Sequence, residues 1–351
     1  MEMPTDIVPS KSQWWQDAVI YEIPLISFQD SDGDGRGDIP GLLARLDYLQ
    51  WLGVDAVWLT PIYPTPFRDF GYDISDYCGV DPAYGSSEDF GRLVTGLHRA
   101  GIRLIMDLVP NHTAAEHPWF RESCASRDNP QADWYLWADP ADNGGAPNNW
   151  LSRFGGSAWQ WHGAREQYYY HSFLPEQPDL NWRNPAVHAA ITAVMRYWLE
   201  RGVDGFRVDA SAVLIKDALL RDNPPDVEAD AKTPPPQRST AVFTDDRPQT
   251  MDCIEMLRSV IDKYDGRLLC GEVQGKTDRI GHFYGAARPR LHLPLNFALL
   301  DSEWSTFALQ ATIDAYYNAL PEHAWPVWVI GGHDKQRVAS KTGRPRSACL
   351  R

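Results

Sequence analysis

Short apolar runs alternate with amphipathic segments along much of this chain, and this alternation limits the folds that it can adopt. The runs Ala18–Ile23, Val54–Leu59 and Ile102–Val109 have the β-branched and aromatic character of buried strands. Between the first two runs, leucines recur at helical spacing from Leu42 to Leu52. Strands that alternate with helices are typical of a parallel sheet with right-handed crossovers. The sequence therefore predicts an α/β fold built around a parallel sheet.

The alternation resumes in the second half of the chain. The stretch Gly202–Ser211 begins as a strand, and further strands are expected at Arg267–Cys270, Leu291–Phe297 and Val327–Ile330. The sequence offers no eighth strand. We therefore expect a (β/α)8 TIM barrel that is incomplete, with seven strands.

About seventy residues interrupt this alternation between the third and fourth expected strands. The interruption is polar and irregular, with many glycines, prolines, asparagines and aromatic residues. A loop of that length inside a barrel is usually functional, and we interpret it as a subdomain inserted after the third strand. The predicted organisation is a first part of the barrel in residues 1–112, the inserted subdomain in 113–182, the rest of the barrel in 183–343 and an aberrant tail in 344–351.

Reactive side chains follow several of the expected strands at their carboxyl ends, namely His112, Arg207 with Asp209, Glu272, and His333 with Asp334. The carboxyl ends of barrel strands converge on one face, so we expect these side chains to meet there. Three carboxylates at one mouth suggest glycoside chemistry, with one as nucleophile, one as general acid and base, and one that holds the sugar. For Arg207 and Asp209 alone, a structural ion pair would be the better interpretation. The guanidinium is expected to lower the pKa of the Asp209 carboxyl and keep it ionised.

An acidic loop follows the first expected strand. It carries the carboxylates of Asp30, Asp32, Asp34 and Asp38, with the backbone carbonyl of Arg36 between the last two. Oxygen ligands at this spacing match the early positions of a calcium loop, so we expect structural Ca²⁺, or Mg²⁺ in its place. A bare acidic turn and a glycine loop that binds phosphate are the alternatives, and four carboxylates argue against phosphate.

Charge and cysteine usage restrict the partners and the compartment. The formal net charge of −14 repels nucleic acid and anionic membrane surfaces, so neither is an expected partner. The five cysteines are scattered and lack C-x-x-C spacing, which indicates reduced thiols. The first residues contain no apolar leader segment, and no apolar run has the length of a membrane span. A cytoplasmic location is therefore expected.

Several segments, in order and at similar spacing, resemble the conserved segments of the alpha-amylase family of glycoside hydrolases. They are DLVPNH (Asp107–His112), GFRVDA (Gly205–Ala210), GEV (Gly271–Val273) and HDK (His333–Lys335). In addition, QPDLNW (Gln177–Trp182) is similar to the segment that marks the oligo-1,6-glucosidase and alpha-glucosidase branch. The resemblance covers nearly all of the chain.

The resemblance implies a role for each matching residue. Asp209 would be the nucleophile, Glu272 the general acid and base, and Asp334 the stabiliser of the transition state. His112, Arg207 and His333 would bind the sugar in the −1 subsite, where the cleaved glucose sits. Asp69 and Tyr72 match the residues that grip the terminal glucose in this branch.

The expected activity is that of a retaining alpha-glucosidase acting on maltose and short alpha-gluco-oligosaccharides. Ala210 follows the nucleophile, and in this branch a valine there accompanies alpha-1,6 activity, so the smaller alanine favours alpha-1,4 linkages. An oligo-1,6-glucosidase, a sucrose- or trehalose-forming isomerase, an inactive truncated homologue and a catalytically silent interaction domain remain alternatives.

The chain departs from the family pattern in two places. Gly332 stands where the family has asparagine before His333, and after Gly343 the residues are basic and patternless. We expect truncation there, with the last barrel strand and the C-terminal β-domain of the family absent. The arginine that this branch pairs with the terminal-sugar aspartate then has no counterpart. The unclosed barrel edges would favour oligomers or poor solubility.

Overall fold

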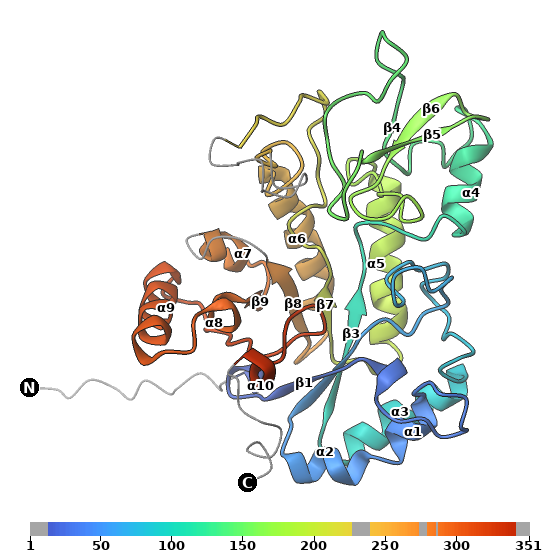
Figure 1. Cartoon of the computed structure of the whole chain (residues 1–351). Helices are drawn as coiled ribbons and strands as arrows, with labels where there is room; N and C mark the ends of the chain where they lie inside the picture. The colour runs from blue at the N-terminus through green and yellow to red at the C-terminus, as the bar shows by residue number, and fades with distance from the viewer. Residues whose placement is uncertain (1–12, 227–238, 274–278, 286, 342–351) are drawn as a thin grey trace, which may run out of the picture.

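A parallel sheet of six strands forms the framework of the molecule (Figure 1). The computed structural model describes residues 13–226, 239–273, 279–285 and 287–341. The strand order is β1-β2-β3-β7-β8-β9, and all neighbouring pairs are parallel. The strands are β1 (Ile20–Ile23), β2 (Ala56–Leu59), β3 (Arg103–Leu108), β7 (Gly205–Val208), β8 (Leu268–Val273) and β9 (Leu293–Asn296). The predicted α/β fold is confirmed, as a curved sheet that forms part of a barrel.

The predicted seventh strand at Val327–Ile330 is wrong. This segment has no strand partner among the described residues, so the sheet there contains six strands rather than seven. It contacts α9 (Thr306–Ala319): the Val327 amide donates to the Tyr316 hydroxyl at 3.2 Å, and Trp328 packs against the Tyr316 ring at 4.9 Å. Val327 also packs against the inner face of the sheet. Side-chain contacts fix the segment beside the sheet without a backbone ladder. The expected tail at 344–351 lies outside the described residues.

Most of the helices connect successive strands, and several of them pack on the outer face of the sheet. They are α1 (Ile39–Leu43), α2 (Leu46–Leu52), α3 (Ser87–Arg99), α5 (Pro185–Leu199), α6 (Pro248–Ile261), α7 (Ile280–Tyr284), α8 (Ala298–Asp301), α9 (Thr306–Ala319) and α10 (Val338–Lys341). Two short 3₁₀ turns, η1 (Trp14–Gln16) and η2 (Leu25–Ser27), flank β1. The leucine repeat predicted as one helix forms α1 and α2, and Gly53 ends α2 with a φ of +77°. No described helix is long and apolar enough to cross a membrane.

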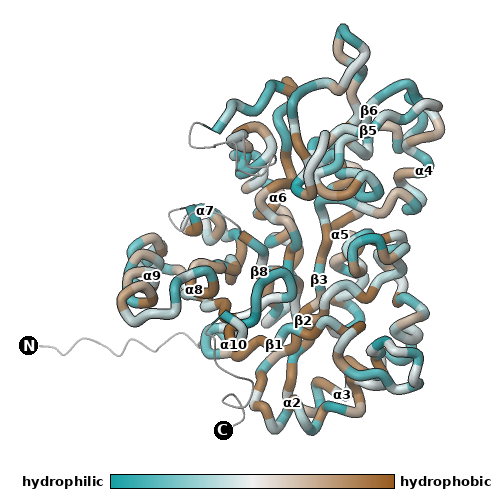
Figure 2. The backbone as a smooth tube through the Cα atoms, in the orientation of Figure 1, coloured by the Kyte–Doolittle hydropathy of each residue, from teal (hydrophilic) through white to brown (hydrophobic). Residues whose placement is uncertain are grey.

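Side chains on each strand alternate between two faces. Outward-facing residues such as Val57, Met106 and Phe206 join the helices in the main hydrophobic core. Inward-facing residues such as Ile105 and Cys270 form a second, smaller cluster. Figure 2 shows the hydrophobic colours running along these strands. Because Asp107, Arg207 and Glu272 have the inward register of the second cluster, the sheet presents all three on its concave face.

A separate three-stranded antiparallel sheet lies between β3 and α5. Its order is β4-β6-β5, formed by β4 (Trp137–Ala138), β5 (Trp159–His162) and β6 (Gln167–Tyr170), and α4 (Pro118–Ala125) precedes it. Trp150, Trp159 and Tyr170 pack together as a core of its own. In Figure 1 this inserted segment stands at one end of the main sheet. Its position places it over the carboxyl ends of the strands.

Candidate active site

A cavity of about 730 Å³ lies beyond the carboxyl ends of the main strands. Most of the residues singled out in the sequence as catalytic or sugar-binding line it, namely Asp69, Tyr72, His112, Asp209, Ala210, Glu272, His333 and Asp334. Arg207 lies just beneath, bonded to two of these carboxylates. The fold thus brings together residues that are far apart in the sequence.

The Arg207 guanidinium lies at the centre of this site and donates hydrogen bonds to three carboxylates. One terminal nitrogen donates to Asp107 at 2.9 Å and to Asp209 at 2.6 Å, and the other donates to Glu272 at 2.5 Å. Strand register explains the arrangement, because Asp107 on β3 pairs directly with Arg207 on β7. Trp58 on β2 supports the guanidinium, with its ring centroid 4.9 Å from the Arg207 Cζ. All of these groups project from the concave face of the sheet.

Burial dominates the protonation of this cluster. Burial raises the pKa of Asp209 to about 8, although Arg207 lowers it and the Glu272 charge raises it further. Burial also raises the pKa of Asp107 in spite of Arg207. The prediction that the pKa of Asp209 is lowered is therefore wrong, because its net pKa is raised. Burial outweighs Arg207, whose single positive charge is shared among three buried carboxyls. These groups titrate together, and the cluster tends to retain a proton near neutral pH.

His333 joins the cluster to the first strand. Its Nδ1 contacts the Glu22 carboxylate on β1, and its ring stacks on Tyr72 with centroids 5.5 Å apart and an interplanar angle of 17°. Burial lowers the pKa of His333, but the bond to Glu22 outweighs it and the net pKa is raised. Asp334 lies 3.4 Å from the other ring nitrogen, with 69% of its side chain exposed. Asp334 thus lies at the cavity wall and is held less tightly than Asp209 or Glu272.

Behind the polar wall of the cavity, the buried Gln177 connects two of the residues that line it. Its amide nitrogen donates to Asp69 at 2.8 Å and lies 3.1 Å from the His112 Nε2. Burial lowers the pKa of His112 to about 4, so the ring is neutral at pH 7. Burial raises the pKa of Asp69, and the Gln177 bond opposes that rise. Gln177 opens the QPDLNW segment, which was a signal in the sequence for this position.

A buried ion pair anchors the inserted segment behind this wall. The Lys216 ammonium, on the loop after β7, contacts the Asp179 carboxylate and donates to the Asn111 side-chain oxygen at 2.8 Å. Asp179 also accepts from the Ser172 amide at 2.7 Å. The Asn111 amide nitrogen lies 3.2 Å from the His112 Nδ1. The network thus connects the insertion, the loop after β7 and the histidine at the cavity.

Several functional candidates were missed in the sequence. Asp107 was visible only as the first residue of the DLVPNH segment, and Glu22 carried no signal. The cavity is also lined by Arg153, Asp245 and Arg337, which stand in irregular segments without periodicity. Arg337, which follows the seventh expected strand, is a basic side chain at the cavity, whereas the sequence analysis found no counterpart of the arginine that this branch pairs with the terminal-sugar aspartate.

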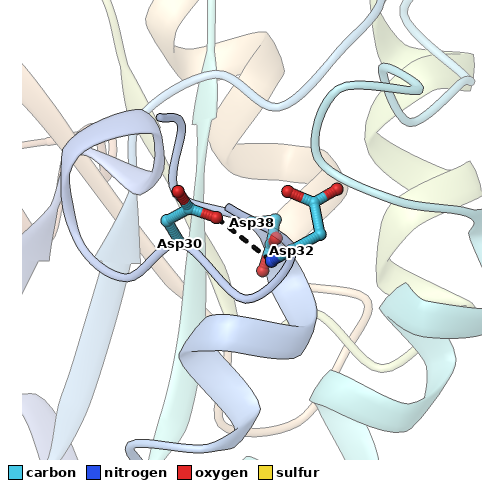
Figure 3. A group of neighbouring side chains, drawn as sticks. All are labelled: Asp30, Asp32 and Asp38. Atoms are coloured by element: carbon cyan, nitrogen blue, oxygen red, sulfur yellow. Dashed lines mark hydrogen bonds between the residues drawn. The ribbon is translucent and has the colours of Figure 1, made fainter. Parts of the chain in front are cut away.

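The acidic loop brings three of its four predicted carboxylates together (Figure 3). Oxygens of Asp30, Asp32 and Asp38 all lie within 4.8 Å of one another, whereas Asp34 lies outside this group. Asp30 accepts from the Gly33 amide at 2.7 Å and the Gly35 amide at 2.8 Å. These bonds lower the pKa of Asp30. Three hard oxygen donors fit Ca²⁺ or Mg²⁺ chemically, with further ligands from backbone or water.

Known proteins show which family shares this arrangement. The family model for the alpha-amylase catalytic domain matches residues 23–350. A probable alpha-glucosidase of Rhizobium meliloti (strain 1021) is 43% identical over 350 residues, which cover 97% of this chain and 63% of that protein. An oligo-1,6-glucosidase of Parageobacillus thermoglucosidasius is 40% identical over 343 residues, which cover 94% of this chain and 60% of that protein.

A solved structure of a related enzyme has the same fold as this chain. The crystal structure of the alpha-glucosyl transfer enzyme XgtA matches with a TM-score of 0.91 and 43% identity, covering 96% of this chain and 64% of that one. The chain spans less than two thirds of the length of these relatives. Sequence, fold and site agree, and the chain belongs to the alpha-amylase family of glycoside hydrolases.

Proposed function

We propose that the protein is a retaining alpha-glucosidase that removes terminal glucose from maltose and short alpha-1,4-linked oligosaccharides. The observation that carries the proposal is the pair of carboxylates on one guanidinium: Asp209 and Glu272 are bonded to the two terminal nitrogens of Arg207. Retaining glycosidases need two carboxyl groups about 5–5.5 Å apart, and a shared guanidinium keeps two carboxylates close together. The names of the related proteins support the same substrate class.

The mechanism follows from the roles of the two carboxyls. Asp209, in its ionised form, attacks the anomeric carbon while Glu272, as the general acid, protonates the glycosidic oxygen, and the bond to the leaving sugar breaks. Glu272 then takes a proton from water, which displaces Asp209 from the anomeric carbon and releases glucose with net retention. Arg207 orients the nucleophile, and its charge compensates the carboxylate that remains ionised.

Two residues that line the cavity could bind hydroxyls of the terminal glucose. Asp69 and His112 line the cavity, and the buried Gln177 behind them contacts both side chains. A neutral His112 can act as donor or acceptor to a sugar hydroxyl, and the carboxylate of Asp69 accepts strongly. Asp334 and His333 approach from the other chain segment, where Asp334 would stabilise the positive charge of the transition state.

The linkage preference is proposed to depend on Ala210. This residue lines the cavity directly after the nucleophile, and its small side chain leaves room beside the scissile bond for a 4-linked ring. A methylene-sized difference in a pocket is worth about 1–3 kcal/mol, so a preference for alpha-1,4 linkages is expected rather than exclusion of alpha-1,6 linkages.

Two further expectations accompany this function. We propose that Asp30, Asp32 and Asp38 hold one structural Ca²⁺ or Mg²⁺ ion, because they offer converging carboxylate oxygens. We also propose a cytoplasmic location, which agrees with the free state of the cysteines at positions 78, 124, 253 and 270.

Glucose transfer to a second sugar is the other candidate activity. The name of the related transfer enzyme favours it, and both reactions share the same covalent intermediate. Water accepts the glucosyl group in hydrolysis, and a sugar hydroxyl accepts it in transfer.

The direct test is release of glucose from a chromogenic aryl alpha-glucoside by the purified chain. The unmodified chain should be active, and Asp209→Asn should lower turnover by several orders of magnitude with an unchanged circular dichroism spectrum. Equal rates for the two chains, or no release by the unmodified chain, would contradict the proposal.

A further inference from the structure

The inserted segment and the excursion between β7 and α6 are joined by hydrogen bonds. The Asn148 and Asn149 side chains donate to the backbone carbonyls of Leu220 and Asn223 at 2.9 and 2.8 Å, respectively. The Asn223 backbone amide donates to the Asn149 side-chain oxygen at 2.8 Å, and the Trp150 indole donates to the Arg221 carbonyl at 2.8 Å. Two segments far apart in the sequence therefore form one continuous wall.

Close to these joined segments, an ion pair lines the cavity. Arg153 Nη2 lies 2.5 Å from Asp245 Oδ2, and both residues line the cavity together with Asp209 and Glu272. The backbone holds each partner in place, because the Arg153 amide donates to the Ser172 carbonyl at 2.9 Å and the next residue, Asp246, donates to the Ala212 carbonyl at 2.9 Å. The side chains are 39% and 30% exposed, so the pair is accessible from the cavity without being freely solvated.

The position of Glu272 identifies which part of the substrate this pair would meet. A general acid stands beside the oxygen that leaves, so the ring beyond the scissile bond lies on its side. The Arg153 guanidinium is close enough to Glu272 for the two charges to interact favourably. A guanidinium has five N–H donors, so Arg153 can hold Asp245 and still donate to sugar hydroxyls. Asp245 supplies carboxylate oxygens that can accept from the same ring.

We propose that the Arg153–Asp245 pair binds the second sugar ring, which is the leaving group before cleavage and the acceptor during transfer. The inference rests on the proposed glucosidase function and adds a specificity-determining pair to it. The pair would act on ligands with two rings and leave recognition of the first glucose unchanged. It would also favour transfer over hydrolysis, because a bound second sugar competes with water for the intermediate.

Equilibrium binding separates the two rings. In an Asp209→Asn background, which prevents turnover, methyl alpha-glucoside and maltose are titrated by calorimetry. Arg153→Ala should raise the Kd for maltose about tenfold or more, the size expected for loss of one charge-assisted hydrogen bond. The Kd for methyl alpha-glucoside should change by less than about twofold. Asp245→Asn should weaken maltose binding selectively as well, and it provides a second variant if Arg153→Ala does not fold.

The matched control is Arg127→Ala. Arg127 pairs with Asp139 in the same inserted segment at 3.0 Å and does not line the cavity, so both ligands should bind as before. An equal loss of affinity for both ligands in the Arg153 and Asp245 variants, or no loss for either, would overturn the inference alone. Failure of the background chain to bind either ligand would contradict the proposed function and the inference with it.

Discussion

Lys216 offers a prediction about how the inserted segment is held to the sheet. Its side chain is 2% exposed, and its partner Asp179 is fully buried. Removing one member of a buried ion pair leaves the other charge uncompensated and typically costs about 3–5 kcal/mol. In Lys216→Met, Asp179 keeps donors from Ser172 at 2.6 and 2.7 Å and from Asn111 at 2.9 Å. These hydrogen bonds partly compensate the unpaired charge of Asp179, so the free energy of unfolding is expected to fall by about 3 kcal/mol, the lower end of that range.

A double-mutant cycle isolates the pair. Asp179→Asn should also destabilise, because the Lys216 ammonium loses its counter-charge and faces a side-chain amide. The double variant Lys216→Met with Asp179→Asn removes both charges and should be less destabilised than the sum of the two single changes by about 2 kcal/mol or more. Urea denaturation followed by circular dichroism gives the free energies of unfolding.

The exposed pair of Arg127 and Asp139 is the control for this cycle. Its side chains are 46% and 67% exposed, so Asp139→Asn, which leaves the bonds from Arg127 to the Arg165 and Glu166 carbonyls in place, should change stability by less than about 1 kcal/mol. Additive single effects at Lys216 and Asp179, or single effects as small as that of the control, would refute the argument that this buried pair joins the insertion to the sheet.

Three further predictions concern pH, linkage and the cation. Burial lowers the pKa of His112 and His117 to about 4 and that of His292 to about 3. Because the unfolded side chains bind protons first, the stability that each histidine contributes is full above about pH 6.5 and is lost as the pH drops toward 4, by about 3 kcal/mol. The raised pKa of Asp209 acts in the opposite direction over this range, so the effect is measured as a difference: in urea denaturation His292→Gln should lose less stability than the unmodified chain between pH 7 and pH 4, and an equal loss in both chains would contradict this. Ala210→Val should lower the ratio of maltose to isomaltose cleavage. Because Ala210 has a φ of +47°, where a β-branched residue is strained, Ala210→Gly is the comparison: it relieves strain and removes bulk, so it must not lower the ratio. Excess chelator should lower the melting temperature of the unmodified chain and have little effect on Asp30→Asn; equal melting curves with and without chelator would remove the cation from the proposal.

The sequence predicted the framework because strand signals are local. Runs such as Ile102–Val109 identify themselves by composition, and the carboxyl ends of parallel strands must meet on one face. That rule groups Asp209, Glu272 and His112 from the sequence alone. The same local reasoning failed at Val327–Ile330, which has strand composition, because pairing depends on a neighbouring strand that composition does not report.

Other parts of the site depend on register and burial, which single residues do not encode. The pairing of Asp107 with Arg207 is set by the alignment of β3 and β7. The raised pKa of Asp209 follows from burial of three carboxyls around one guanidinium, whereas the sequence showed only the adjacent arginine. Arg153 and Asp245 meet because two irregular segments are joined elsewhere, and no periodic pattern marks either residue.

The central claim is that Asp209 forms a covalent bond to glucose and that Glu272 governs its formation and breakdown. Alpha-glucosyl fluoride has a leaving group that needs little acid assistance, so Glu272→Gln should still form the intermediate but lack the base that activates water for its breakdown. Mass spectrometry of the protein incubated with this substrate, followed by peptide mapping, is the most direct measurement. We predict a mass gain of one glucosyl unit on the peptide that contains Asp209, which is absent in Asp209→Asn with Glu272→Gln. An adduct on another residue, or no adduct although the unmodified chain cleaves the fluoride, would contradict the account.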